Sequence, residues 1–283
     1  MSKEYEKGYK DGFWQGKVNT YGDFVLEAFP PGIILPGYTI PDLIKIAIKY
    51  KKDELKRMVT VEKVYQQIIS SLEERSPLSL VRLGDGEGLA LAQGYCKTNE
   101  ELSKYDFLKY AGISVPDYQA RDELAAAVRE ADIVGIPASL MPDFQPLVCK
   151  VLKYNSINID NLTITNANIH QYLFRLQYFK KILQKNNNKI VLIGNQAIEL
   201  ARILRKYCNI TGVITPVNGI KDIPRILISL RKYSFNLLLV AAGIPAVIIC
   251  SKAARQYKCT ALDIGHLANQ IIKHKTLNFD IFK

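Results

Sequence analysis

The chain has 283 residues, of which 48% are hydrophobic, 23% are charged and 10% are aromatic. This composition is ordinary for a globular protein and excludes a disordered, collagen-like or coiled-coil chain. The net charge of +11 is uneven, because residues 135–283 carry 20 Lys and Arg against 6 Asp and Glu. The basic second half favours an anionic partner such as a nucleotide diphosphate, a nucleic acid backbone or an anionic membrane surface. For most of the individual lysines we favour a solvated helix face instead.

The first 41 residues differ in composition from the rest. Aromatic residues and glycines alternate at a four-residue period between residues 5 and 16, and four prolines fall between residues 30 and 41. We expect a tyrosine and glycine segment followed by a proline-rich linker. The segment could be docked or self-associating, which would allow a homo-oligomer, or it could be a frayed terminus. We then predict two helices, over residues 40–60 and 61–72, at the start of one large domain that spans residues 42–283.

From residue 79 onward, short apolar runs alternate with amphipathic stretches. The predicted strands are residues 79–83, 132–136, 162–165, 189–193, 212–215, 236–242 and 260–264. Among the predicted helices, residues 197–207 place Ile198, Ala201 and Leu204 inward. Buried strands that alternate with helices indicate an α/β, Rossmann-like fold. We therefore expect a largely parallel, doubly wound sheet with helices on both faces, preceded by a helical N-terminal segment.

The compartment is indicated by the cysteines and by the absence of long apolar stretches. Five widely spaced cysteines form no CxxC pair, and the N-terminus lacks a secretory signal, so we expect a reduced, cytoplasmic setting. The longest uncharged interval, residues 233–251, is interrupted by Gly243, Ile244 and Pro245. A membrane-spanning helix needs about 20 apolar residues in sequence, so we predict a buried strand followed by a helix there, and no transmembrane segment.

Ligands of open α/β sheets bind at the carboxyl ends of the strands, where this chain places glycines and small polar residues. The first such loop contains Gly84, Asp85, Gly86, Glu87 and Gly88, a GxGxG spacing that differs from the GxGxxG dinucleotide fingerprint. Two carboxylates would repel a bare pyrophosphate. A divalent cation would reverse that effect.

We consider two interpretations of the acidic pair. In an extended turn, Asp85 and Glu87 would point to the same side and could hold Mg²⁺ or Mn²⁺ together, whereas in a helix they would diverge by about 200°. Alternatively, Asp85 caps the following helix and Glu87 lies favourably in its first turn. For Arg82, an ion pair with one of these acids and contact with a phosphate are both open.

A second informative loop follows the last strand. His266 begins a helix, whose positive end disfavours a protonated imidazole and would keep His266 available as a base. Asp263 could orient it or bind an acceptor hydroxyl. A surface or capping role explains both residues as well. His170 lies after the third strand and resembles this arrangement less closely.

Residues 79–87, with Arg82, Gly84, Asp85 and Glu87, resemble the Arg-x-Gly-Asp-Gly-Glu block of the bacterial GT-D glycosyltransferases. Residues 242–246 and 262–266 are similar to later blocks of that family, and the resemblance covers about residues 60–275. It implies a Rossmann-like catalytic domain that binds a UDP-sugar and a glycan or glycosylated acceptor with Mn²⁺ or Mg²⁺. It also implies that Asp85 and Glu87 act at the metal-bound diphosphate, with Glu87, Asp263 and His266 as the catalytic candidates.

From these residues and this resemblance we expect a metal-dependent transfer of a hexose, and the resemblance implies UDP-glucose as the donor. The nucleotide-sugar pocket is predicted to include Arg82, Gly84, Asp85, Gly86, Gly194, Asn195 and Gly243. A metal-held diphosphate can leave without a proton, and a neutral histidine can deprotonate the acceptor. The alternatives are an NAD(P)-dependent oxidoreductase and a basic nucleic-acid-binding module. The missing GxGxxG argues against the first, and no known reader motif supports the second, so we expect no nucleic acid.

Overall fold

The computed structural model of the chain describes residues 36–138, 144–185 and 187–277, together with Gly8, Gly12 and Gln15. The chain divides into two units, residues 1–56 and 57–283. The first contains helix α2 (Ile40–Tyr50) and the short helix η1 (Lys52–Glu54). Most of the predicted tyrosine and glycine segment lies outside the described residues. The predicted boundary after residue 41 stays a prediction.

Helix α2 is shorter than the sequence indicated. It ends at Tyr50, whereas we predicted a helix to residue 60. Thr60 has an extended backbone, because its side chain accepts a hydrogen bond from Lys63 N and so caps the next helix, α3 (Val61–Glu74). Val59 N also donates to Ile164 O at 2.7 Å, which keeps the chain before Thr60 out of a helix.

The second unit is built on one sheet of seven parallel strands, in the order β3-β2-β1-β7-β6-β4-β5. The strands are β1 (Leu78–Arg82), β2 (Ile133–Ile136), β3 (Ile164–Asn166), β4 (Ile190–Gly194), β5 (Ile210–Ile214), β6 (Leu237–Ala241) and β7 (Thr260–Asp263). Strands β2, β4 and β7 are buried along their whole length. All seven predicted strands are confirmed, and so is the Rossmann-like, doubly wound fold.

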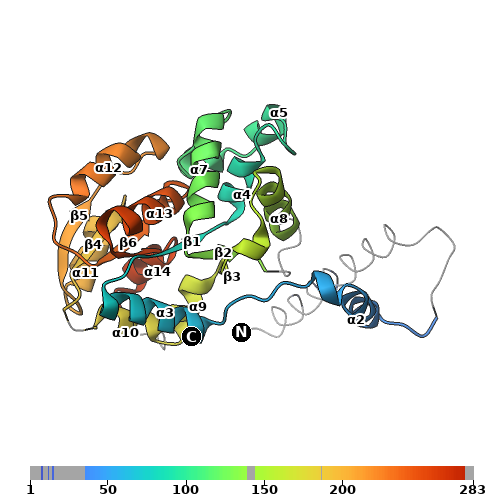
Figure 1. Cartoon of the computed structure of the whole chain (residues 1–283), viewed down its shortest axis with the longest axis horizontal. Coiled ribbons are helices and arrows are strands. Elements are labelled where there is room, and N and C mark those ends of the chain that lie inside the picture. The colour runs from blue at the N-terminus through green and yellow to red at the C-terminus, as the bar shows by residue number, and fades with distance from the viewer. Residues whose placement is uncertain are drawn as a thin grey trace. The chain divides into compact units, whose positions relative to one another are not determined.

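Helices cover both faces of the sheet (Figure 1). One face packs against α4 (Asp85–Ala92), α7 (Tyr118–Glu130), α8 (Phe144–Tyr154), α12 (Ile223–Leu230) and α13 (Pro245–Tyr257). The other packs against α3, α9 (Ile169–Arg175), α10 (Tyr178–Leu183), α11 (Ala197–Leu204) and α14 (Leu267–His274). Short helices complete the unit: α5 (Asn99–Ser103), α6 (Phe107–Tyr110), η2 (Ile159–Asn161) and η3 (Ile220–Asp222). Two apolar cores, one on each side of the sheet, therefore hold the unit together.

Helix α11 corrects one detail of the predicted core. Ala201 and Leu204 are buried as expected, but Ile198 is 49% exposed. The buried face is formed by Ala197, Leu200, Ala201 and Leu204, which recur at helical spacing, and Ile198 lies one position off that stripe.

Gly243 separates β6 from α13 within the long uncharged interval. It adopts φ +61°, a left-handed conformation that favours glycine, and Pro245 is the first residue of α13. The predicted strand and helix are thus confirmed. Among the described residues, none of the helices combines the length and apolar character needed to cross a membrane.

Candidate functional site

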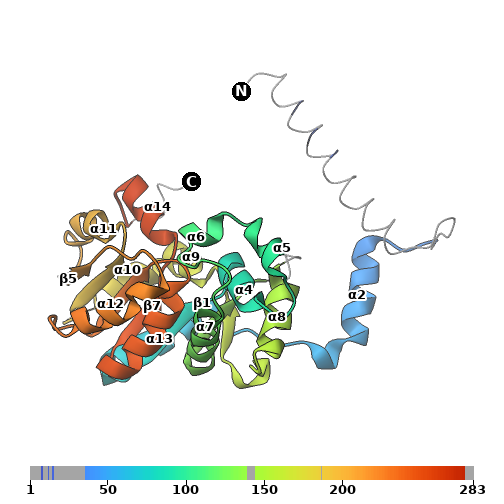
Figure 2. The same cartoon turned by 90° about the horizontal axis from the view of Figure 1, so that it is seen from above.

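Strands β1 and β7 are neighbours in the sheet, and the loops after them lead to opposite faces. The chain leaves β1 for α4 on one face and leaves β7 for α14 on the other (Figures 1 and 2). Such a pair of strands opens a crevice at its carboxyl end, where doubly wound proteins bind ligands. The two loops singled out in the sequence, residues 84–87 and 263–266, meet at this place.

Arg82, at the end of β1, connects three strands. Its Nη2 lies 3.2 Å from Asp263 Oδ1, and its Nε donates to Asp263 O at 3.2 Å. Arg82 therefore binds both the side chain and the main-chain carbonyl of the last residue of β7. Its Nη1 donates to Ala167 O, after β3, at 3.2 Å. The ion pair that the sequence left open is therefore made with Asp263, and not with Asp85 or Glu87.

Arg82 also fixes His170, the second residue of α9. Arg82 Nη1 and His170 Nδ1 are 3.2 Å apart, and because a guanidinium can only donate, Nδ1 accepts and the ring proton belongs on Nε2. His170 is 5% exposed. Its burial, with the charge of Arg82, lowers the pKa of His170 to about 2, so the ring is neutral. The sequence pattern favours His266 over His170, although the place of His170 after β3 points to the same edge of the sheet.

The Arg82 guanidinium occupies the space that a side chain at Gly265 would need. Gly265 has φ +42°, and a Cβ there would lie 1.9 Å from Arg82 Nη2. Of the five N–H groups of Arg82, the contacts above use four within the described part of the chain. Most of the hydrogen-bond donors of Arg82 are thus used by contacts within the protein.

Asp263 and His266 differ sharply in exposure. The Asp263 side chain is buried, and its Oδ1 also accepts a hydrogen bond from Gly265 N at 2.9 Å. Burial raises the pKa of Asp263, while Arg82 opposes that effect. His266 precedes the first turn of α14 and its side chain is exposed. It is near enough to influence both Asp263 and His170 electrostatically. His266 is therefore the accessible member of this group.

The expected extended turn at Asp85 and Glu87 is wrong, because helix α4 begins at Asp85. Glu87 Oε2 accepts a hydrogen bond from Gly84 N at 2.8 Å, and Asp85 Oδ1 accepts one from Gly86 N at 2.8 Å. Glu87 thus lies in the first turn, as the helix-capping interpretation held, but the N-cap is Gly84 and not Asp85. Glu87 cannot point to the same side as Asp85, since two positions along a helix rotate the side chain by about 200°.

The two carboxylates therefore have different environments. Asp85 is exposed, whereas Glu87 is only partly accessible. Burial raises the pKa of Glu87 to about 7, and the negative charge of Asp263 adds to the effect. Asp85 is the carboxylate that is free to meet a ligand from solvent.

Among the described residues, the arrangement suited to a divalent cation is a single exposed carboxylate. No group of three or more His, Cys, Asp and Glu side chains suited to a metal occurs among the described residues. Mg²⁺ and Mn²⁺ often keep several waters and bind one or two carboxylates together with substrate phosphates. Asp85 fits this mode by its exposure and hard oxygen donors, and the shared coordination with Glu87 stays a prediction.

The other predicted nucleotide-sugar residues lie on the same edge of the sheet, farther from β1. Gly194 ends β4 and Asn195 follows it, and β4 is separated from β1 by β6 and β7. The Asn195 side chain is engaged with Val217, donating to its carbonyl at 3.0 Å and accepting from its N–H at 2.7 Å. Asn195 thus ties two loops together.

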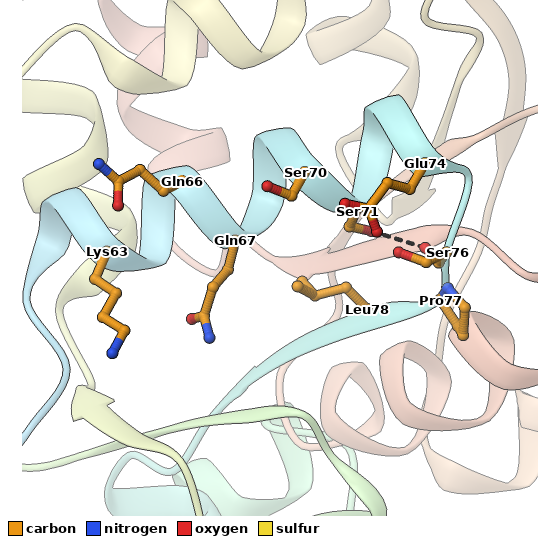
Figure 3. A pocket seen from close by; sticks show the side chains of 9 residues that line it. All are labelled: Lys63, Gln66, Gln67, Ser70, Ser71, Glu74, Ser76, Pro77 and Leu78. Carbon is orange, nitrogen blue, oxygen red and sulfur yellow. Dashed lines mark hydrogen bonds between the residues drawn. The ribbon is translucent and has the colours of Figure 1, made fainter.

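A separate pocket of about 290 Å³ lies along α3 and the start of β1 (Figure 3). Polar side chains dominate its lining: Lys63, Gln66, Gln67, Ser70, Ser71, Glu74 and Ser76, with Pro77 and Leu78. Ser71 Oγ donates to Ser76 O at 2.8 Å and also contacts Thr260. None of the predicted site residues lines this pocket.

Fold and site together define a doubly wound α/β protein whose polar site residues gather at the carboxyl ends of β1 and β7. The chain matches the family model described as the GT-D fold-like domain over residues 59–271, so it belongs to the GT-D-like family. The resemblance drawn from Arg82, Gly84, Asp85 and Glu87 is thereby confirmed.

Two solved structures are similar to the chain. One is described as the "Selenomethionine substituted structure of domain of unknown function 1792", with 14% identity, a TM-score of 0.48, and coverage of 77% of this chain and 87% of that one. The other is described as "The highly conserved domain of unknown function 1792 has a distinct glycosyltransferase fold", with 14% identity, a TM-score of 0.49, and coverage of 75% and 81%. No curated protein matches the chain.

Proposed function

We propose that the chain is a glycosyltransferase that moves a hexose from a nucleotide-diphosphate sugar, with UDP-glucose as the expected donor, to a glycan or glycosylated acceptor. The observation that carries the proposal is the placement of two exposed side chains, Asp85 and His266, just after the neighbouring strands β1 and β7 of a GT-D-like domain. The first is suited to the leaving diphosphate and the second to the acceptor hydroxyl.

The diphosphate would bind at the start of α4. The positive end of the helix favours phosphate there, and the Asp85 carboxylate would hold a divalent cation against it. When bound, Mn²⁺ or Mg²⁺ would neutralise the charge that develops on the departing diphosphate. We assign the contact with the cation to Asp85. Glu87 would instead hold Gly84, and therefore the start of α4, in position through its hydrogen bond.

The acceptor hydroxyl needs a base, and we assign that role to His266. Asp263 was the other candidate, but its side chain is buried and is already bound to Arg82 and Gly265. His266 is exposed at the first turn of α14, on the same edge of the sheet as Asp85. A neutral imidazole in that position can accept the hydroxyl proton as the new glycosidic bond forms.

Thermal unfolding with a panel of nucleotide sugars, each with and without Mn²⁺, tests the proposal. We expect stabilisation by a UDP-sugar that depends on Mn²⁺ and is lost in Asp85→Asn. Asp122→Asn removes an equal charge from the surface of α7 and should leave the stabilisation unchanged. Stabilisation by NADH alone, or by DNA alone, would contradict the proposal and favour one of the rival functions.

A further inference from the structure

The connection between α4 and α7 folds over the carboxyl edge of the sheet. This segment carries α5 and α6 (Figure 2). Just after α6, Ala111 O accepts a hydrogen bond from Ile244 N, in the loop after β6, at 2.9 Å. Gly112 O accepts one from Ile220 N, in the loop after β5, at 3.1 Å. The residues just after α6 are therefore held by hydrogen bonds to the segments that follow β5 and β6.

Close packing holds the same segment against the start of α4. A Cβ on Gly86 would lie 3.6 Å from the Ala111 Cβ, which is ordinary van der Waals contact. A Cβ on Gly243 would lie only 2.6 Å from Ala111 O, so the backbone of Ala111 fills the space above that glycine. Ala111 thus touches the helix turn that contains Asp85, and its position is fixed from two sides.

Tyr110 comes directly before this fixed residue, yet its side chain is 88% exposed. It is the most exposed large hydrophobic side chain among the described residues. The other exposed tyrosines of the unit have ring partners: Tyr95 stacks on Tyr154 at 5.8 Å, and Arg121 lies over the ring of Tyr118. No ring partner or hydrogen bond of Tyr110 occurs among the described residues. An uncovered ring on a well-held backbone is an arrangement suited to stacking with a flat ligand.

We propose that Tyr110 is the platform on which the nucleobase of a nucleoside diphosphate stacks while its phosphates face Asp85. The inference rests on the proposed function and extends it to the residue that recognises the base. A nucleobase is favoured because Tyr110 directly precedes Ala111, which lies against the turn where we propose that the phosphates bind, and because every base presents a π-face to an aromatic side chain. Stacking of this kind holds a base without selecting strongly among bases.

Calorimetric titration of the full chain with UDP and with inorganic pyrophosphate, both with Mn²⁺, tests this. In Tyr110→Ala we expect the Kd for UDP to rise between about 5-fold and about 150-fold, and the Kd for pyrophosphate to stay the same. Tyr110→Phe keeps the ring and should bind UDP like the wild type. Tyr50→Ala is the matched control, because Tyr50 is 87% exposed and lies in the other unit.

The outcomes separate the two proposals. If the wild-type chain binds neither UDP nor pyrophosphate, the proposed function fails and the inference falls with it. If the wild-type chain binds UDP but Tyr110→Ala binds it equally well, the stacking role alone is overturned. Equal loss of UDP and pyrophosphate in Tyr110→Ala also overturns it, since the change would then act on the phosphates and not on the base.

Discussion

The Arg82 guanidinium and the Asp263 carboxylate form an ion pair between β1 and β7, with Nη2 and Oδ1 3.2 Å apart. The Arg82 side chain is 16% exposed and that of Asp263 is 4% exposed, so little solvent screens the pair. Two neighbouring strands that send their loops to opposite faces are thus joined at their carboxyl ends. The ion pair fixes the edge on which the proposed ligands would lie.

We predict that Arg82→Met destabilises the domain strongly. Removing one partner leaves the Asp263 carboxylate buried without its counter-charge, which typically costs about 3 to 5 kcal/mol. The free energy of unfolding in urea measures the loss. Arg255→Met is the control, because Arg255 pairs with Glu130 at the surface, where side chains that are about half exposed are worth at most about 1 kcal/mol. Equal small effects of the two substitutions would contradict a structural role for Arg82.

The second prediction concerns Gly265. A methyl group on Gly265 would overlap Arg82 Nη2, and the left-handed backbone there disfavours any side chain. We expect Gly265→Ala to lower the free energy of unfolding by about 1 to 3 kcal/mol. Gly86→Ala is the matched control, because a Cβ there meets only ordinary contacts within helix α4, where alanine is favoured by up to about 1 kcal/mol. Differential scanning calorimetry compares the two variants, and an unchanged Tm in Gly265→Ala would show that Arg82 can move aside without cost.

The sequence was sufficient for the fold because most strands are short runs rich in apolar residues that lie between polar turns. It was also sufficient to place Asp85, Asp263 and His266 at one edge, since the carboxyl ends of parallel strands share an edge. It could not show that the helix begins at Asp85, because Gly-Asp-Gly-Glu is compatible with a turn and with a capped helix. The pairing of Arg82 with Asp263 was equally hidden, since the two residues are 181 positions apart and meet only when β1 pairs with β7.

His170 gives a prediction on pH. Its folded-state pKa lies far below the ordinary value of 6.5, so below pH 6.5 the unfolded chain takes up a proton that the folded chain does not. Protonation therefore favours unfolding as the pH falls, by up to about 1.4 kcal/mol for each pH unit. His170→Asn keeps an oxygen that can accept from Arg82 but does not titrate. Urea unfolding between pH 7 and pH 5 should show a shallower loss of stability in His170→Asn than in the wild type. Parallel slopes would mean that His170 is accessible to protons in the folded state.

Glu87 gives the opposite pH dependence, because its contribution to stability is lost as the pH rises. Its folded-state pKa is raised from 4.5 to about 7, so between these values the folded chain holds a proton that the unfolded chain has released. This contribution to stability is complete below pH 4.5 and is lost as the pH rises to about 7. Glu87→Gln keeps an oxygen that can accept from Gly84 N and stays neutral at every pH. Measured without metal between pH 5 and pH 8, the gain in stability of Glu87→Gln over the wild type should grow with pH. Asp122→Gln, on the exposed surface of α7, should show no such trend. A constant difference between Glu87→Gln and the wild type would mean that the Glu87 carboxylate is already ionised at pH 5, and that Glu87 is as free as Asp85 to bind a cation.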